Sequence, residues 1–463
     1  MMNSSPFPTP AKGLPLLGHL VPLLRDPLGF LARLPARGDL VQVRLGPLRA
    51  LVVCDPDLTC DVLRDDRTFD KGGPVYERLR EFAGNGLATC PYGDHRRQRR
   101  LLQPAFHPAR LPGYARAAAA RAAETTGSWQ DGQILDVLAV LQELTVRITV
   151  DTLFSTTVPP DLLTQALSDL NTLVSGLTVR MATPPPMDRL PTLGNRRYHQ
   201  ARARLPRLLH RLVSERQAAG TDHGDLLSML LTAQDPVPGP AEQRLTDTEV
   251  IDQIVTFFLG ATETAASTLA WALHLLGQHP ETERRLHAEV DAVLGGRPAT
   301  HADLPRLELT GRILTETLRL WPSAWGVTRT CTADTHLDRY PVPAGTTIVY
   351  SPYLLHHRAD LYPDPERFDP DRWAPENPRP PRREAYIPFG GGARKCIGER
   401  FVTSEMVLAL ATIATRWRLR PLPGTRVRPT IGGPTLNPSG LRMCAIARTT
   451  TGISSPANRE KPQ

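Results

Sequence analysis

The sequence predicts a mainly α-helical protein with small β-sheets, in an α+β arrangement. Four long runs between residues 108 and 245 repeat apolar residues at helical spacing. Residues 246–280 predict a further helix of about 30 residues, or roughly 45 Å, and its centre is apolar on all sides, as in a buried helix. Strand patterns are few and short. The chain has 463 residues, of which 41% are hydrophobic and 22% charged, so we expect a large core within one domain over 1–463.

The first third of the chain contains most of the weaker patterns. Residues 1–27 are proline-rich and are expected to run along the surface. Residues 39–54 alternate apolar and polar positions on both sides of Gly46, which predicts a hairpin. A short helix is expected over 57–66. Residues 69–90 contain several glycines and have little periodicity, so they predict a mobile loop.

Three further segments complete the expected elements. A helix is predicted over 94–102, where Pro104 ends it. Residues 346–357 predict a strand. Residues 449–463 are expected to form a disordered tail.

Composition and charge exclude several classes of function. The net charge is +8, but the 55 basic residues are spread along the chain and form no concentrated patch of the kind that binds nucleic acid. The six cysteines lack both C-x-x-C spacing and the density of a disulfide scaffold, which is typical of a reducing cytoplasm. No apolar run reaches the ~18 residues that cross a bilayer. We therefore expect a cytoplasmic monomer with no membrane span and no nucleic-acid partner.

The stretch FGGGARKCIG, residues 389–398, is the strongest chemical signal. Its glycines allow a flat group to approach the backbone, and Cys396 stands just before an amphipathic run, where a helix N-terminus favours the thiolate. A thiolate there is a nucleophile or a metal ligand, and the alternative is a structural cysteine beside a turn. Since no His and Asp/Asn pair is marked out as its base, Phe389, Arg394 and the glycines favour axial ligation of haem iron.

The long helix carries the second signal. Gly260, Thr262, Glu263 and Thr264 interrupt its apolar centre, and such residues are costly in a buried helix. One explanation is structural: Thr264 bonds back to the carbonyl of Gly260, and Glu263 finds a salt bridge. The other is catalytic, with a kinked helix over the haem whose carboxylate and hydroxyl deliver protons to bound oxygen.

The pattern F-x-x-G-x-R-x-C-x-G resembles the signature of the cytochromes P450. The motif GATETA over 260–265, an E-x-x-R pair and the segments PERF and FDPDRW follow in the expected order, so the resemblance spans nearly the whole chain. It implies the P450 fold around a buried haem b. Ala261 and Ala265 depart from the family pattern. His95 stands where a Trp is commoner, and taken alone its helix reads as a solvated basic one.

The resemblance also implies roles for particular residues. The haem contacts would be His95, Arg99, Arg329, Phe389, Arg394, Cys396 and Gly398, with Cys396 as the metal ligand. The catalytic pair would be Glu263 and Thr264, and a buried structural triad would be Glu316, Arg319 and Arg367. The substrate pocket would be lined by Val75, Tyr76, Leu79, Phe82, Leu173, Leu177, Phe258, Ala261, Trp325 and Val327.

The implied function is a monooxygenase that activates O2 with electrons from NAD(P)H, passed through a ferredoxin reductase and a ferredoxin. An acidic ferredoxin would dock on the proximal side at Arg96, Arg97, Arg100, Lys395 and Arg400. Segments outside the catalytic motifs resemble those of bacterial sesquiterpene oxidases. We therefore expect the substrate to be a sesquiterpene such as pentalenene, oxidised at a methyl group to the alcohol and then to the aldehyde. This reaction would belong to secondary metabolism, for example to the biosynthesis of an antibiotic. The alternatives are another hydrophobic substrate (a different terpene, a fatty acid or a polyketide), an O2-independent relative, and a non-catalytic haem protein.

Overall fold

The computed structural model describes residues 9–10, 13–14, 16–154, 160–182, 188, 190–237, 243–431 and 435–448. The expected tail over 449–463 lies outside these residues, as does part of the proline-rich segment 1–27.

Helices make up most of the described chain. In chain order they are α1 (Leu20–Arg25), α2 (Pro27–Ala32), α3 (Pro56–Arg64), α4 (Pro74–Ala83), α5 (Tyr92–Leu102), α6 (Leu111–Gly127), α7 (Val137–Phe154), α8 (Pro160–Ala182), α9 (Leu193–Ala219), α10 (Leu226–Thr232), α11 (Asp247–Gln278), α12 (Pro280–Leu294), α13 (Glu308–Leu320), α14 (Pro352–His356) and α15 (Glu399–Arg416).

The strands are short. They are β1 (Thr9–Pro10), β2 (Leu40–Leu45), β3 (Leu48–Val53), β4 (Phe69–Asp70), β5 (Ile134–Asp136), β6 (Val327–Cys331), β7 (Thr335–Leu337), β8 (Tyr340–Val342), β9 (Thr347–Tyr350), β10 (Trp417–Pro421), β11 (Arg428–Ile431), β12 (Leu436–Ser439) and β13 (Arg442–Ala447). The mainly α-helical fold with small sheets is therefore confirmed.

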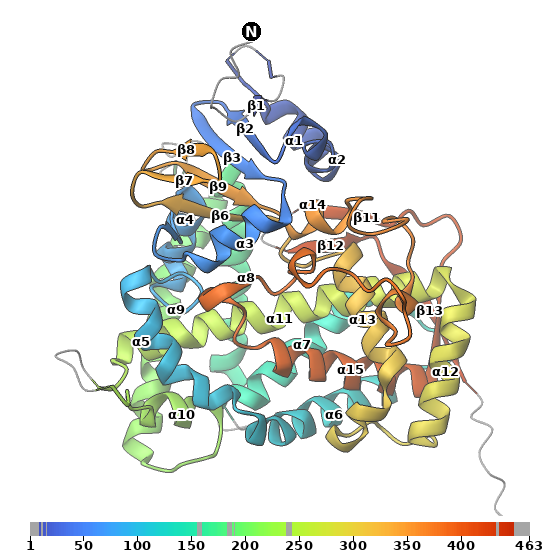
Figure 1. Ribbon diagram of the computed structural model, residues 1–463. Helices are drawn as coiled ribbons and strands as arrows, with labels where there is room; N and C mark the ends of the chain where they lie inside the picture. Colours follow the sequence, from blue (N-terminus) through green and yellow to red (C-terminus); the bar gives the residue numbers. More distant parts are fainter. Residues whose placement is uncertain are drawn as a thin grey trace, which may run out of the picture.

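The largest sheet has the strand order β1-β2-β3-β9-β6-β4. Strands β2 and β3 form the predicted hairpin, with Leu45 paired to Leu48 and Gly46 between them at a φ of 61°. Strand β3 then pairs in parallel with β9, which comes nearly 300 residues later in the chain. This long-range pairing places the sheet beside the helical body (Figure 1).

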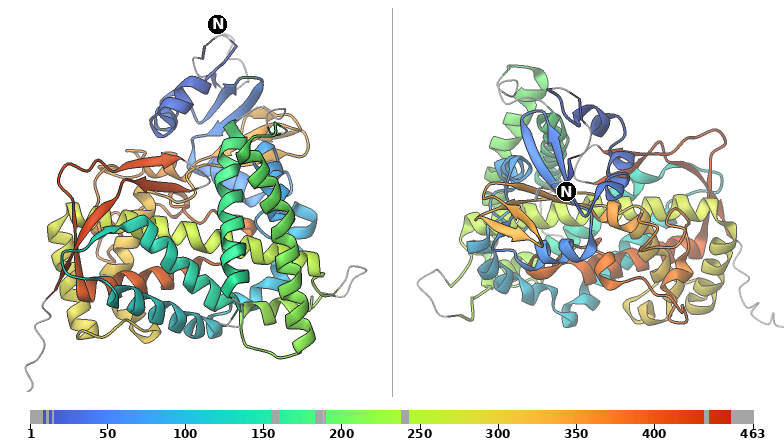
Figure 2. Two further views of the ribbon diagram at one scale, coloured as in Figure 1. Left: turned by 180° about the vertical axis from the view of Figure 1, so that it is seen from behind. Right: turned by 45° about the horizontal axis from the view of Figure 1, so that its top comes forward.

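The long helix α11 crosses the helical body, and α15 runs below it in the same view (Figure 1). Apolar residues of α11, α13 and α15 share one buried cluster with residues of α6, α7 and α12. Helices α8 and α9 lie side by side behind this body (Figure 2) and share a second cluster with the first half of α11. The centre of the molecule therefore lies between α11 and the loop that leads into α15.

Helix α11 begins and ends where its sequence predicts. The hydroxyl of Thr246 accepts a hydrogen bond from the backbone of Glu249, and the Glu249 carboxylate accepts one from the backbone of Thr246. This reciprocal capping satisfies backbone donors at the helix start. The helix runs without interruption to Gln278, and Pro280 begins α12.

Two expectations about secondary structure were wrong. Residues 69–90 contain the helix α4 rather than an irregular loop, and Arg80 in its last turn donates to the backbone carbonyls of Lys71 and Thr89. The apolar residues Val75, Tyr76, Leu79 and Phe82 recur at helical spacing within α4, and the contacts of Arg80 stabilise the helix further. The predicted strand over 346–357 divides into β9 and α14, because Ser351 caps a helix that begins at Pro352.

Candidate active site

The loop before α15 presents Cys396 to the centre of the molecule. It is closed by a hydrogen bond of 2.9 Å from the backbone N–H of Cys396 to the carbonyl of Phe389. Gly392 has a φ of 63°, and a Cβ there would collide with the carbonyl oxygen of Leu63. A glycine is therefore required at this turn. Gly398 follows as the N-cap of α15.

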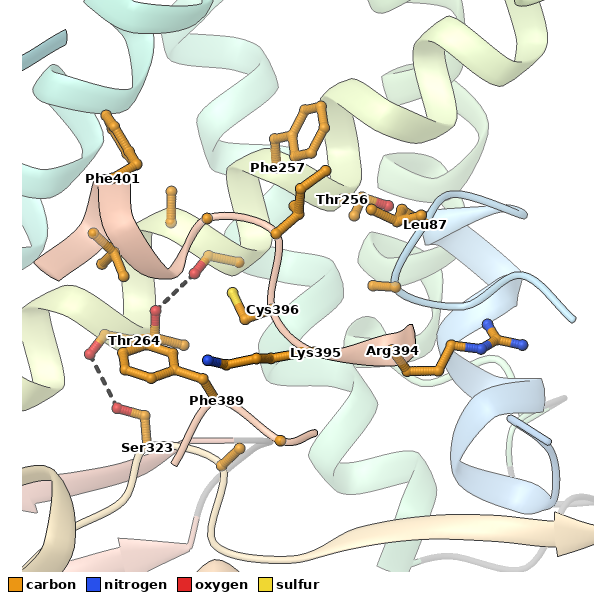
Figure 3. A pocket seen from close by; sticks show the side chains of 18 of the residues that line it. Leu87, Thr256, Phe257, Thr264, Ser323, Phe389, Arg394, Lys395, Cys396 and Phe401 are labelled. Atoms are coloured by element: carbon orange, nitrogen blue, oxygen red, sulfur yellow. Dashed lines mark hydrogen bonds between the residues drawn. The ribbon is translucent and has the colours of Figure 1, made fainter. Parts of the chain in front are cut away.

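A cavity of about 360 Å³ opens in front of the Cys396 thiol. Phe389 and the glycine loop form one side of it, and Gly260, Ala261 and Thr264 of α11 line it as well. Figure 3 shows Phe389, Lys395 and Cys396 together on the loop, with the Arg394 side chain directed away from the cysteine. Cys396 is exposed, and it lines the cavity together with Phe389, Gly390 and Lys395 of the same loop.

Basic side chains gather at the same cavity. Arg99, Arg329, Lys71 and His95 all line it. The guanidinium of Arg99 donates to the backbone carbonyl of Lys395 at 2.6 Å. In the described part of the chain, no carboxylate forms an ion pair with Arg99, Arg329 or Lys71, whose donors are taken by carbonyls, hydroxyls and a side-chain amide oxygen.

Arg394 also lines this cavity, where the sequence predicts that it binds a haem carboxylate. Its guanidinium pairs with Asp66 at 3.1 Å and Asp70 at 2.7 Å, and it also donates to the carbonyl of Cys90. Two carboxylates therefore already neutralise Arg394, and its role toward a haem stays a prediction.

Burial and neighbouring positive charges lower the pKa values of Lys71 and His95. Burial, followed by the charges of Arg329 and Arg394, lowers the pKa of Lys71 to about 7. Burial and the neighbouring cations lower the pKa of His95 to about 3, and its Nδ1 has no hydrogen-bond partner in the described structure. A bound anion would offset this positive potential. The carboxylates of a haem fit these residues.

Opposing effects act on the pKa of the Cys396 thiol. Burial raises its pKa, while a hydrogen bond from the backbone of Gly398 and the charges of Arg99 and Lys71 lower it. Since a metal binds the thiolate, ligation releases the proton. The donor groups around the sulfur therefore stabilise the ligated state that the sequence predicts.

Thr264 lies across the cavity from the cysteine loop. Its hydroxyl donates to the carbonyl of Gly260 at 2.7 Å, which is the bond of the structural explanation. Its own carbonyl accepts from the hydroxyls of Thr268 and Ser323 (Figure 3), both of which also line the cavity. Thr264 thus combines a helix bond with access to the cavity.

Glu263 does not form the salt bridge of the structural explanation. In the described residues its one partner is Thr435, whose hydroxyl donates to Oε2 at 2.9 Å. Burial raises the pKa of Glu263, and the hydrogen bond from Thr435 lowers it. The carboxyl group of Glu263 is therefore a candidate for moving a proton, because burial favours its protonated form and the Thr435 hydroxyl favours its ionised form.

The third member of the buried triad was predicted wrongly. Glu316 and Arg319 are fully buried and pair at 2.8 Å, as expected. Arg367 is exposed and contributes only its backbone carbonyl, whereas Arg372 reaches Glu316 at 3.4 Å. The short helical turn over Pro370–Trp373 carries Arg372 inward, and Trp373 also donates to Glu316 at 2.8 Å.

Most of the predicted pocket residues do not line the cavity. Tyr76, Ala261 and Val327 do. The others lie in or against apolar clusters elsewhere, or outside the cavity lining: Val75, Leu79, Phe82, Leu173, Leu177, Phe258 and Trp325. Phe257 lines the cavity in place of Phe258, because one residue turns a helix by about 100°. Sequence reasoning also missed Lys71, although a lysine is rare in this arginine-rich chain.

The predicted docking surface is less basic than expected. Arg97 pairs with Glu249, Arg100 with Asp235, and Lys395 with Glu399, at distances of 2.5–2.8 Å. Arg96 and Arg400 are exposed, and no described carboxylate forms an ion pair with either. Most of the charge in this group is therefore compensated locally.

None of the described helices is long and apolar enough to cross a bilayer.

A cysteine-bearing loop, a long helix across from it and a cavity with basic residues between them are the features expected of a protein that would hold a large planar anionic cofactor through a thiolate. Residues 8–445 match the sequence profile of the cytochrome P450 family. The chain belongs to the cytochrome P450 family, as the sequence predicted, and membership implies haem iron as the cofactor.

Three relatives from Streptomyces are 44–48% identical to the chain. It is 48% identical to cyclooctat-9-en-7-ol 5-monooxygenase from Streptomyces melanosporofaciens, over 90% of each chain. It is 46% identical to cyclooctatin synthase from the same organism, over 90% of this chain and 91% of that one. It is 44% identical to pentalenene oxygenase from Streptomyces avermitilis, over 95% and 97%. Among solved structures, the cytochrome P450DA heme domain superposes with a TM-score of 0.86 at 28% identity, covering 96% of this chain and 98% of that one.

Proposed function

We propose that this protein is a haem-thiolate monooxygenase that oxidises an apolar terpenoid in secondary metabolism. The observation that carries the proposal is the cavity between Cys396 and α11, whose α11 wall presents Phe257, Gly260 and Ala261 to any molecule held there. Relatives that are 44–48% identical over at least nine-tenths of the chain are named for oxidations in terpenoid chemistry.

The bound haem supplies the activation of O2, favoured by electron donation from the Cys396 thiolate. Arg99, Arg329, Lys71 and His95 would hold the haem carboxylates. Ala261 and Phe257 would keep water away from the reacting carbon. Thr264 and Glu263 would move protons toward the cavity, one through its hydroxyl and the other through its carboxyl group.

The substrate that we favour is a sesquiterpene such as pentalenene, oxidised at a methyl group to the alcohol and then the aldehyde. An apolar wall holds a hydrocarbon by burial, at about 25 cal/mol per Å² of apolar surface, without a directional anchor. Shape would then place one methyl group toward the iron. Support comes from the likeness to pentalenene oxygenase over 95% of the chain.

A second candidate is a polycyclic alcohol. The hydroxyl of Thr256 lines the cavity, is buried and has no partner in the described structure. A buried hydroxyl without a partner is costly, and a substrate hydroxyl would satisfy it. The relative at 48% identity is named for a substrate of this kind.

Electrons would come from NAD(P)H through a ferredoxin reductase and an acidic ferredoxin, to a monomer in the cytoplasm. Support for a charged docking surface rests on Arg96 and Arg400, which remain exposed near the cysteine loop. The other arginines of the predicted surface would contribute less, because acidic neighbours neutralise them.

The test is a spectral titration followed by product analysis. Pentalenene, cyclooctat-9-en-7-ol and a saturated fatty acid would each be added to the oxidised protein, and then turned over with NAD(P)H, ferredoxin and reductase. We expect a spin-state change and a new hydroxyl group with at least one of the two terpenoids. Thr256→Val should weaken only the alcohol. Binding and turnover of the fatty acid alone would refute the terpenoid assignment.

A further inference from the structure

The C-terminal hairpin of β11 and β12 is tied to the long helix beside the catalytic motif. The backbone carbonyl of Leu436 accepts hydrogen bonds from Ser267 Oγ at 2.7 Å and Trp271 Nε1 at 2.8 Å. Its backbone N–H donates to the carbonyl of Ser323 at 3.1 Å. These bonds fix the position of the residues on either side of Leu436.

Thr435 uses this fixed position to reach Glu263. Its side chain is buried, with 4% of the residue exposed, and its Oγ1 lies 2.9 Å from Glu263 Oε2. Asn437 Nδ2 donates to the same Oγ1 at 3.3 Å. Because a hydroxyl has a single proton, the bond accepted from Asn437 directs that proton to the carboxylate.

We infer that Thr435, oriented by Asn437, is a positioning residue for the Glu263 carboxyl group and tunes its acidity from a separate part of the chain. The inference rests on the proposed function, in which Glu263 moves protons toward the cavity.

The surroundings of Glu263 make a single hydrogen bond decisive. Burial raises the pKa of its carboxyl group, and in the described structure Thr435 is the one partner that opposes this shift. No basic side chain contributes to the shift. The ionised form of Glu263 therefore depends on the Thr435 hydroxyl more than it would in a charged network.

The same geometry keeps the carboxyl group oriented. Oε2 accepts the hydrogen bond from Thr435. Oε1 has no hydrogen bond within the described chain. Glu263 is also only half-buried. Oε2 therefore keeps a fixed position on Thr435.

The experiment follows the protonation of Glu263 directly in the resting, haem-loaded protein. Infrared difference spectra are recorded across a pH titration, and the C=O band of the protonated acid is assigned by its loss in Glu263→Gln. Thr435→Val removes the hydroxyl at nearly constant volume, whereas Thr435→Ser keeps it. The matched control is Thr430→Val on β11, which removes a threonine hydroxyl of the same hairpin whose one bond within the described residues goes to the backbone carbonyl of Asn437.

We expect the band in Thr435→Val to persist to higher pH than in the wild type, because the bond that stabilises the carboxylate is lost. Thr435→Ser and Thr430→Val should titrate as the wild type does. Asn437→Ala should shift the titration in the same direction as Thr435→Val, which tests the inference through a second variant. A wild-type titration in both Thr435→Val and Asn437→Ala would overturn it.

A turnover measurement adds the functional consequence. In Thr435→Val, product formed per NAD(P)H consumed should fall and its pH dependence should move with the infrared titration. The infrared measurement needs neither substrate nor electron donor. A failed terpenoid assay would therefore refute the proposed function, whereas the inferred effect of Thr435 on Glu263 would still be tested by the infrared titration. An unchanged yield and an unchanged pH profile beside a shifted band would overturn the catalytic part of the inference.

Discussion

Replacing Arg372 by methionine removes a cation from the buried cluster around Glu316 and keeps a side chain of similar length. Arg372 is 8% exposed, contacts the Glu316 carboxylate at 3.4 Å and donates to the carbonyl of Pro363 at 2.9 Å. A hydrogen bond to a charged group contributes about 1.5–3 kcal/mol, whereas Pro363 is exposed and its carbonyl adds little because it can turn to water. We therefore expect Arg372→Met to lower the free energy of unfolding by roughly 2 kcal/mol.

Two matched variants bracket this value. Arg319→Met leaves Glu316 without its bidentate partner and strands the carbonyls of His356 and Pro365. Breaking such a buried pair costs roughly 3–5 kcal/mol. Arg367→Met alters an exposed side chain that makes no ion pair in the described structure, so we expect little change.

The assay is unfolding in urea, followed by far-ultraviolet circular dichroism of the haem-loaded variants, with reversibility checked by dilution. The expected order of destabilisation is Arg319→Met, then Arg372→Met, then Arg367→Met. If Arg367→Met destabilised the protein as much as Arg372→Met, the placement of the second arginine in the cluster would be refuted.

Further expectations concern the site and its surroundings. Cys396→His should abolish the red-shifted Soret band of the reduced CO complex, and an unshifted band in the folded wild type would contradict thiolate ligation. Thr264→Ala should keep haem binding but divert NAD(P)H electrons to peroxide, whereas Thr264→Ser should retain product yield. Arg96→Glu should slow reduction by an acidic ferredoxin at low salt and have less effect at high salt, since charges are screened over about 8 Å at physiological ionic strength. Arg207→Glu on α9, an exposed arginine away from the cysteine loop, should not slow it. Burial raises the pKa of Glu405 to about 8. The unfolded chain therefore binds fewer protons between its own pKa of about 4.3 and pH 8, and stability should fall by roughly 4–5 kcal/mol across that range. Glu405→Gln should remove this decline in urea unfolding measured at several pH values.

Local sequence patterns identified the parts of the site that are local in the chain. The glycines, Phe389 and Cys396 lie within ten residues, and a turn followed by a helix decides their geometry. The start of α11 was also predictable, because Thr246 and Glu249 satisfy each other's backbone groups within one turn. Membership of the family followed from motifs of this local kind.

Residues that meet only through the fold were predicted poorly. Arg367 and Arg372 both lie in plausible motifs, and only the turn over Pro370–Trp373 decides which one points inward. The cavity lining failed for a similar reason, since Phe257 and Phe258 are both buried but only one faces the cavity. A shift of one residue changes the face of a helix, and no local pattern fixes that rotation.

Glu263 on α11 was predictable from the local sequence, whereas its hydrogen-bond partner depends on the fold. The motif GATETA places Glu263 beside Thr264, so the sequence alone suggested a proton-delivering pair. The strength of that acid depends on Thr435, which lies 172 residues later on the chain. Burial disfavours the charged form of this acid, and the hydrogen bond from Thr435 favours it. In the proposed function the motif therefore specifies which group would carry the proton, and the inferred role of Thr435 lets the C-terminal hairpin influence the pH at which that group would release it.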